Sequence, residues 1–378
     1  MQGPTLSFYM LTILLFILIL SFLVMIHEFG HFMMAKRAGI GVEEFGFGLP
    51  PRLWGKKVKG TIYSINWLPF GGFVRLVGED PTDKKSFAKN SFQVKSLWQR
   101  TWVVLAGVFM NFVVAVVVYY FVVAALGFKV NLPLLIPHDF KFVNQTEQVL
   151  VSDVTPNSVA AKAGLKPGDS IIAANGQPVP SVESLQKIVR SNENKKVIFT
   201  IENPVNNQKS EVTVTPQYNQ ILKAPAIGVA LGELVSLNYD TIPQKAFSGF
   251  IQSYNAMSYS FAVLGKLISH SINTGDIAPV SAGVSGPVGI ASITSDAVAA
   301  GPISVLQLIA LLSLNLAVMN VLPIPALDGG RFFFILIEAI TRKKPKPVVE
   351  KWVHSVGFVV LIGLIVLITY NDVLKLLK

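Results

Sequence analysis

The sequence predicts a polytopic α-helical membrane protein with four transmembrane helices, an extracytoplasmic α+β domain and a membrane-associated β-hairpin region. Of its 378 residues, 51% are hydrophobic and only 14% are charged, a balance far from that of a soluble domain. Four apolar segments are each long enough to cross a bilayer, which takes about 20 residues. The uneven distribution of basic residues is the third observation, because it orients these segments.

Seven segments make up the predicted architecture. In order they are a transmembrane helix at 1–35, a β-hairpin region at the cytoplasmic membrane face at 36–97, a transmembrane helix at 98–128, an extracytoplasmic domain at 129–232, an extracytoplasmic amphipathic helix and linker at 233–302, a broken transmembrane helix at 303–341 and a fourth transmembrane helix at 352–372. Basic residues first occur at Lys36 and recur in the loops after the first and third apolar segments. Since cytoplasmic loops are rich in Lys and Arg, we expect both loops inside and both termini outside. The net charge of +10 therefore reflects topology and does not indicate a nucleic-acid partner.

The first apolar segment contains three ionisable side chains, those of His27, Glu28 and His31. Two imidazoles four residues apart lie on one helix face and can bind one metal ion, and the neighbouring glutamate is placed to act on a metal-bound water. An accidental cluster would bury these groups unliganded in lipid at a cost on the order of several kcal/mol. The pattern thus predicts a hydrolytic metal site inside the membrane.

The third apolar segment is interrupted by Pro323 and Pro325, and Asp328 follows at once. Prolines remove amide donors, so the freed backbone must find partners within the protein or at a wet cavity. A Zn²⁺ ion held by two histidines takes one further protein ligand and keeps a position for water, which makes Asp328 the expected third ligand. Alternatively, Asp328 pairs with Arg331 or caps the helix that restarts after the break.

Residues 145–217 have the pattern of a compact α+β domain. We predict strands at 149–151, 169–172, 197–201 and 211–215, a hairpin turn at 175–176 and a capped helix at 181–191. The stretch from Ala163 to Val179 closely resembles a PDZ domain, which would take an extended peptide as an added strand. Ile227-Gly228-Val229 resembles the loop that receives the end of that peptide. The domain is expected either to bind a peptide ligand or only to restrict access by its bulk.

The remaining polar residues of interest receive simpler interpretations. An apolar pattern at 244–267 predicts a helix at the outer membrane face or against the spans. His138, His270 and His354 are not expected to bind the metal, and Glu338 is assigned no role.

The His-Glu-x-x-His motif and the Asn-x-x-Pro-x-Pro-x-Leu-Asp-Gly motif that begins at Asn320 together resemble the site-2 protease family of intramembrane zinc metalloproteases. A single PDZ domain between the second and third spans is similar to the bacterial regulator of sigma-E protease branch. The resemblance covers nearly the whole chain, including residues 68–76 and 285–290. Some relatives carry two tandem PDZ domains, whereas this chain has room for one.

The resemblance implies a role for each motif residue. His27, His31 and Asp328 would bind one Zn²⁺ per chain, Glu28 would be the catalytic base for the zinc-activated water, and Asn320, Pro323 and Pro325 would contact substrate. It implies a zinc metalloendopeptidase of the bacterial cytoplasmic (inner) membrane, surrounded by membrane lipid. Its partners would be transmembrane protein substrates, such as anti-sigma factors or remnant signal peptides, cleaved within or near their transmembrane segments.

Residues 61–67 and 73–77 are β-rich and flank a turn that contains Pro69, Gly71 and Gly72. Family members are thought to use such a hairpin, dipping into the membrane, to clamp an unwound substrate by strand addition. Gly71, Gly72, Phe73 and Val74 are therefore expected to bind substrate. The alternative is a plain cytoplasmic hairpin.

Two other classes of protein remain as alternatives. A transporter would also have a broken span with an intramembrane aspartate, but it would not need the paired histidines. A catalytically inactive membrane scaffold presenting a PDZ domain would be expected to have lost Glu28 or a metal ligand, and all of these residues are present.

Overall fold

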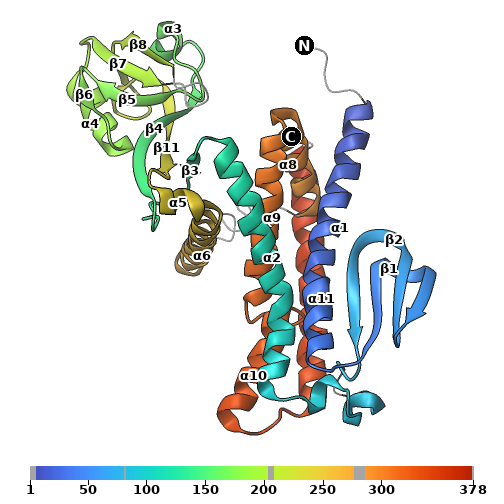
Figure 1. The fold of residues 1–378 in the computed structure, drawn as a ribbon. Helices are drawn as coiled ribbons and strands as arrows, with labels where there is room; N and C mark the ends of the chain where they lie inside the picture. The colour runs from blue at the N-terminus through green and yellow to red at the C-terminus, as the bar shows by residue number, and fades with distance from the viewer. Residues whose placement is uncertain (1–5, 81, 203–207, 276–285, 377–378) are drawn as a thin grey trace. The chain divides into compact units, whose positions relative to one another are not determined.

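The computed structural model describes residues 6–80, 82–202, 208–275 and 286–376, and the chain divides into two compact units. One unit, which we call the helical unit, consists of Met1–Val122 and Gln252–Lys378. The other, which we call the β unit, consists of Val123–Ile251. Each unit has its own buried hydrophobic clusters, and Figure 1 labels the elements of both.

Four helices are long and apolar enough to cross a membrane, as the sequence predicts. They are α1 (Leu6–Arg37), α2 (Leu97–Ala125), α9 (Pro302–Val321) and α11 (Pro347–Leu376). α1 has Lys36 and Arg37 in its last turn, where cations interact favourably with the helix dipole and with a membrane interface.

The third apolar segment is divided between two helices. α9 ends at Val321, and α10 (Asp328–Thr341) begins after a short non-helical segment. Pro323 and Pro325 lie in that segment and lack amide hydrogens, which prevents one continuous helix. The break therefore places Asp328 in the first turn of a new helix.

A shorter apolar helix, α8 (Pro287–Ala300), packs against α1, α9 and α11. The Oδ2 atom of Asp372 in α11 accepts hydrogen bonds from the amides of Gly286 and Gly289, both at 2.9 Å. A carboxylate in this position satisfies amides that the first turn leaves free and interacts with the helix dipole. This cap gives a structural role to Gly286 and Gly289 in the stretch 285–290, which the sequence analysis singled out. Ser285, the first residue of that stretch, lies outside the described residues.

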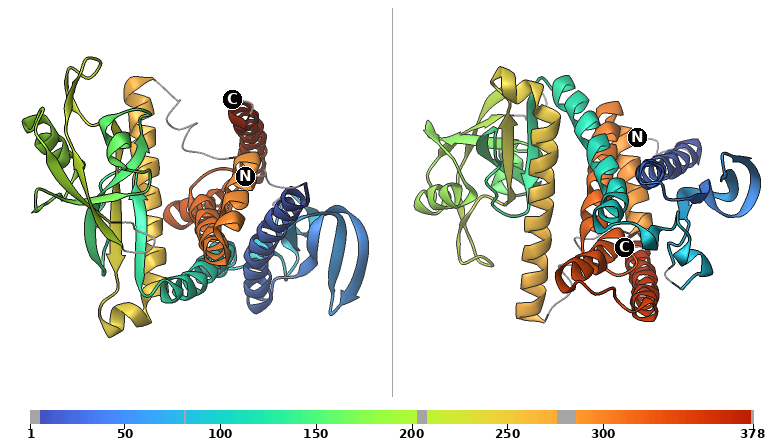
Figure 2. Two further views of the ribbon diagram at one scale, coloured as in Figure 1. Left: turned by 90° about the horizontal axis from the view of Figure 1, so that it is seen from above. Right: turned by 60° about the horizontal axis from the view of Figure 1, so that its bottom comes forward.

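Two long antiparallel strands, β1 (Val42–Val58) and β2 (Thr61–Leu76), form a sheet beside α1 (Figures 1 and 2). Phe45 in the first half of β1 pairs with Tyr63 on one side and with Val74 on the other. β1 thus runs between the two halves of β2.

This arrangement corrects the predicted hairpin. Direct pairing of 61–67 with 73–77 is wrong, because residues 42–47 lie between them. The physical reason is the length of β1, whose alternating buried pattern from Val42 to Phe47 lets it pair on both sides. Residues 72–76 then form one edge of the sheet.

The remaining elements of the helical unit are short turns and one long helix. They are the 3₁₀ turns η1 (Lys84–Phe87) and η2 (Phe92–Val94), and α6 (Ser248–Thr274). α6 covers most of the helix predicted at 244–267. Ala256 and Met257 of α6 pack on a cluster that contains Tyr119 of α2 and Leu314 of α9.

The β unit is built on a mixed-length antiparallel sheet in the order β3-β11-β4-β5-β7-β8, with β6 paired to β5. Its strands are β3 (Lys129–Leu134), β4 (Asn144–Val154), β5 (Ser170–Ala174), β6 (Gln177–Pro178), β7 (Val197–Glu202), β8 (Lys209–Val214), β9 (Gln217–Asn219), β10 (Ala224–Ala226) and β11 (Val229–Asn238). Its helices are α3 (Val159–Ala163), α4 (Val182–Ser191) and α5 (Ile242–Ala246).

The predicted elements of this domain are present. α4 has Ser181 as its N-cap, and Ser181 and Ser184 form a reciprocal capping box. Asn175 and Gly176 join β5 to β6 with φ values of 50° and 78°, the conformation that two-residue hairpin turns require. The core beneath contains fully buried residues such as Phe199.

Candidate metal centre

The two motif histidines lie on one face of α1. Since α1 is helical through this stretch, His27 and His31 project one turn apart, and their Nε2 atoms are 3.1 Å from each other. Each residue is 8% exposed. Two imidazole nitrogens are therefore directed at a single buried point.

Asp328 of α10 joins this pair. Its Oδ2 atom is 2.9 Å from Nε2 of His27 and 3.1 Å from Nε2 of His31. Among the residues that the structure describes, these three form the one group of potential metal ligands whose atoms converge in this way. The site is thus assembled from two helices that are far apart in the sequence.

Neither alternative role of Asp328 is observed. Arg331 forms its ion pair with Glu79 instead. The N-cap position of α10 is occupied by Leu327, and Asp328 is already inside the helix. Its carboxylate is consequently directed to the histidines.

α2 orients both imidazole rings. Nδ1 of His31 is 2.7 Å from the carbonyl oxygen of Val103, to which it donates. Nδ1 of His27 is 3.4 Å from the side-chain amide of Asn111, a fully buried residue. The Val103 carbonyl fixes the ring orientation and tautomer of His31, as acceptors do for metal-binding histidines, and Nδ2 of Asn111 contacts the ring of His27.

The backbone of α2 passes directly beside the histidines at Gly107. A Cβ atom added there would lie 2.5 Å from Nε2 of His31 and 2.7 Å from Nε2 of His27. Gly30 makes the reciprocal contact from α1, where a Cβ would lie 2.4 Å from the carbonyl oxygen of Ala106. Small residues allow such close approach of two membrane helices, so these glycines set the distance between α1 and α2 at the site.

The donor set fits a zinc ion. Because Nδ1 of His31 donates to a carbonyl, its Nε2 presents a lone pair to the cluster. Oδ2 of Asp328 is buried without a hydrogen-bond partner in the described part of the chain. The carboxylate oxygen of Asp328 and the Nε2 lone pair of His31, 3.1 Å apart, repel each other unless a cation lies between them. Three nitrogen and oxygen ligands with an open position are typical of catalytic zinc sites.

Glu28 lies beside the ligand cluster and is held by the sheet. Its Oε2 atom accepts a hydrogen bond from the amide of Val74 at 3.0 Å. Glu28 is half-buried, so one carboxylate oxygen is fixed by the backbone of β2. The other oxygen remains to face a reactant.

The same edge of the sheet is anchored along α1. The hydroxyl of Ser21 donates to the carbonyl of Pro69 at 2.9 Å and accepts from the amide of Gly71 at 3.2 Å. A Cβ at Gly72 would lie 2.2 Å from Sδ of Met25. Ser21, Met25 and Glu28 share one face of α1 because they are spaced by four and three residues. The structure thus brings the predicted substrate-binding residues of β2 to Glu28.

A buried carboxylate stiffens the sheet behind this edge. Glu44 accepts hydrogen bonds from Arg52 at 2.9 and 2.6 Å and from Ser64 at 2.7 Å. Burial alone would raise the pKa of Glu44, but the hydrogen bonds and the charges of Arg52 and Arg75 outweigh it and hold the pKa below its ordinary value. Glu44 therefore stays ionised at neutral pH and links three strand segments.

The other predicted substrate residues lie at the break before α10. Asn320 is half-buried in the last turn of α9, and Pro323 and Pro325 follow in the non-helical segment 322–327. All three thus lie in the part of the chain that leads directly to Asp328.

The glycines after Asp328 make room for that segment. A Cβ at Gly329 would lie 2.0 Å from the carbonyl oxygen of Leu322, and one at Gly330 would lie 2.5 Å from that of Ile324. The segment therefore folds back onto the first turn of α10, which only glycine permits.

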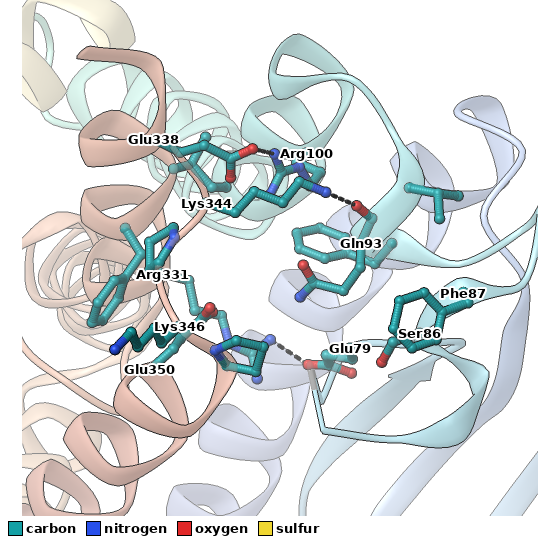
Figure 3. Close-up of a pocket in the computed structure, with 16 residues that line it drawn as sticks. Glu79, Ser86, Phe87, Gln93, Arg100, Arg331, Glu338, Lys344, Lys346 and Glu350 are labelled. Carbon is teal, nitrogen blue, oxygen red and sulfur yellow. Dashed lines mark hydrogen bonds and ion pairs between the residues drawn. The ribbon is translucent and has the colours of Figure 1, made fainter. Parts of the chain in front are cut away.

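A second group of charges anchors α10 (Figure 3). Glu338 pairs with Arg100 of α2 at 2.7 Å; Arg100 is buried and Glu338 is half-buried. Arg331 pairs with Glu79, and these residues line a cavity of about 340 Å³. Removing one member of a buried pair is costly because it leaves an uncompensated charge. Glu338, which received no role from the sequence, thus holds α10 against α2.

In the β unit, the segment Ile227-Gly228-Val229 lies at the start of β11. Gly228 has a φ of +80°, a conformation that favours glycine. β4 pairs with the whole of β11, but β3 pairs only with residues 233–238. In the described part of the chain, the β3 side of residues 229–232 is paired with no strand.

Sequence reasoning missed the contribution of α2. Gly107 and Asn111 were the available signals, since a glycine and an amide are both unusual within an otherwise large and apolar helix. Val103 could not have been found, because it acts through its carbonyl oxygen. His354 of α11, which was expected to have no part in metal binding, contacts the segment before Asp328.

Comparison with known proteins identifies the family. The model of peptidase family M50 matches residues 15–364. A protein of Clostridium perfringens is 34% identical over 95% of this chain and 97% of its own length. Zinc metalloprotease RasP of Geobacillus kaustophilus is 28% identical over 96% of this chain and 98% of its own. Regulator of sigma-W protease RasP of Bacillus subtilis is 27% identical over 97% and 99%.

The chain was also compared with solved structures. The PDZ domain of an SdrC-like protein from Listeria monocytogenes covers 22% of this chain and 85% of its own, with 20% identity and a TM-score of 0.20. A TM-score that low does not establish a shared fold. The family match, by contrast, spans both motifs and nearly the full chain, and the chain belongs to peptidase family M50, the site-2 protease family of zinc metalloproteases.

Proposed function

We propose that this zinc metalloprotease hydrolyses peptide bonds within or near the transmembrane segments of other membrane proteins, with His27, His31 and Asp328 as its zinc ligands. The observation that carries the proposal is the convergence of these side chains at α1, a helix apolar enough to cross a membrane. Burying ionisable side chains in such surroundings costs free energy, and residues of this kind therefore mark functional sites.

The chain's own residues divide the catalytic work. When bound, zinc supplies Lewis-acid chemistry that makes water a nucleophile near neutral pH. Glu28 acts as general base: it accepts a proton from the attacking water and returns it to the leaving amine. The amide of Val74 holds Oε2 of Glu28, which leaves Oε1 directed at the reaction.

The sheet edge at residues 71–74 is proposed to bind the substrate. A substrate helix must unwind to expose its scissile amide, and its freed backbone groups then need partners. Residues 72–76 pair with β1 on one side only, and their other side lies at α1 and Glu28. Strand addition there would bring a peptide bond to Glu28, and Asn320, Pro323 and Pro325 are proposed to contact the substrate as well.

The topology and partners are proposed from charge distribution and likeness. Positive-inside placement puts the loops after α1 and α10 in the bacterial cytoplasm, and the β unit and both termini outside the inner membrane. One relative is named a regulator of sigma-W protease. Anti-sigma factors and remnant signal peptides are accordingly the candidate substrates.

The β unit is proposed to be a PDZ domain with a peptide ligand. The unpaired side of residues 229–232 begins directly after the Gly228 turn. An extended peptide could add there as a strand, with its end at Ile227-Gly228-Val229. If it binds no peptide, the domain restricts access by its bulk.

The test compares cleavage of a model single-span substrate by the purified protein and by Glu28→Gln in vesicles. We expect Glu28→Gln to lose about 10³-fold or more in rate, as removal of a general base does, while it retains zinc. The exposed Glu183→Gln in α4 is the matched control and should cleave normally. Equal cleavage by wild type and Glu28→Gln would refute the proposal, and solute flux independent of Glu28 would favour a transporter.

A further inference from the structure

A histidine of α11 contacts the segment that leads to Asp328. The amide of Ala326 donates to Nδ1 of His354 at 2.9 Å. Because a backbone amide can only donate, Nδ1 must be the unprotonated nitrogen of the ring. The other ring nitrogen, Nε2, is buried and makes no hydrogen bond in the described part of the chain, so the hydrogen bonding of this imidazole is directed at the segment.

The amide that donates to His354 belongs to a residue in an unusual backbone conformation. Ala326 has a φ of +75°, which residues other than glycine rarely adopt and which persists only where the surroundings enforce it. Ala326 precedes Asp328 by two residues. Its conformation therefore decides the direction in which the chain enters α10.

Few other groups can fix this segment. Pro323 and Pro325 have no amide hydrogen. The amide of Ile324 bonds within the segment, to the carbonyl of Leu322 at 2.7 Å. Among the hydrogen bonds of the described residues, the bond from Ala326 to His354 is the one that joins a backbone amide of the break to a helix other than α9 and α10.

One turn after His354, α11 also packs closely against the segment. A Cβ at Gly357 would lie 2.2 Å from Cβ of Pro325 and 3.0 Å from its carbonyl carbon and oxygen. His354 and Gly357 are three residues apart and share one helix face. From α10, the ring of Phe334 lies 5.6 Å from that of His354 and limits its rotation.

We propose that His354 is a positioning residue for the metal site. Its Nδ1 atom holds Ala326 in the left-handed conformation and thereby places the carboxylate of Asp328 between His27 and His31. The inference rests on the proposed function insofar as Asp328 is a zinc ligand. It assigns α11, whose residues supply none of the ligands, a direct part in building the site.

The test uses three substitutions of the full-length purified protein, with zinc affinity measured by chelator competition and cleavage measured in parallel. His354→Asn puts an acceptor oxygen where Nδ1 lies, and we expect zinc affinity within about 3-fold of wild type. His354→Gln places its oxygen near the position of Nε2, and His354→Leu has no acceptor. Both should lose about 10- to 100-fold in zinc affinity, the range found for outer partners of metal ligands. His270→Leu, at an exposed histidine of α6, is the control.

Rescue by asparagine separates positioning from packing, because a purely structural role would depend on ring volume and not on the acceptor. Wild-type affinity in His354→Leu, or equal losses in all three variants, would overturn the inference. If zinc affinity follows the expected order but no form cleaves substrate, positioning stands and the proposed protease function fails. If wild type cleaves and affinity is unchanged in His354→Leu, the proposed function stands and positioning fails.

Discussion

The two halves of the candidate metal site are held in place by different means. We call the half on α1, with His27 and His31, the helix-held half, and the half with Asp328 the loop-held half. His27 and His31 project from an unbroken helix and are oriented by α2, through the Val103 carbonyl and Asn111. Asp328 follows a non-helical segment that is held by α11 and by its own folding onto α10. Helical periodicity alone places the two histidines together, whereas the position of Asp328 depends on contacts that no local pattern encodes. The two halves should therefore fail in different ways when their supports are changed.

The largest expected effect is on the helix-held half, from Gly107→Leu. A Cβ alone would lie 2.5 Å from Nε2 of His31, and a leucine would fill the space where the ligand atoms converge. We expect zinc affinity to fall by about 10³-fold or more, beyond the range of an outer partner, with cleavage lost in proportion. Zinc binding is measured as the zinc content after dialysis, and cleavage is measured in vesicles.

Gly363→Ala in α11 is the control for Gly107→Leu, because a Cβ there has nothing within 4 Å. It should bind zinc as wild type does. Zinc bound normally by Gly107→Leu would show that α2 does not border the ion, and the description of the helix-held half would be wrong.

A smaller effect is expected in the loop-held half, from Gly329→Ala. The added Cβ would meet the carbonyl oxygens of Leu322 at 2.0 Å and of Val321 at 2.5 Å, and backbone atoms cannot move aside as a flexible side chain can. The segment must shift, and Asp328 with it. We expect a 10- to 100-fold loss of zinc affinity, similar to that of an outer partner.

Helix propensity separates this clash from a general weakening of α10. Alanine is the better helix former by about 1 kcal/mol, so a loss of zinc affinity in Gly329→Ala would come from displacement of the segment. Unchanged affinity would mean that Asp328 is placed independently of the break, and the contrast between the two halves would disappear.

The sequence predicts the elements of this fold better than their contacts. The four apolar helices and the capped helix at Ser181 follow from hydrophobic length and from cap residues. The pairing of β1 with both halves of β2 could not be predicted, because it depends on which strands meet in space. The interruption by Pro323 and Pro325 was visible in the sequence, but its conformation was not.

The site shows the same division. The distance between His27 and His31 follows from a spacing of four residues, and Asp328 was identified from zinc chemistry. The supports were not predictable: Val103 acts through a backbone oxygen, which carries no sequence signal. His354 acts at a place that only tertiary packing creates.

The smallest expected effect distinguishes chemical support from bulk within the helix-held half, at Asn111. Asn111→Leu removes the polar partner of Nδ1 of His27, and we expect zinc affinity to fall about 10-fold, at the low end for outer partners. The atom of Asn111 that faces Nδ1 of His27 is the amide nitrogen Nδ2. Asn111→Asp puts a carboxylate oxygen there, which can accept the Nδ1 proton when Nε2 binds the ion, and should bind zinc at least as tightly as wild type, since carboxylate partners raise the basicity of a metal-binding histidine. Chelator competition measures both. Equal losses in the two variants would mean that α2 supports His27 by filling space, and the helix-held half would then depend on packing in the same way as the loop-held half.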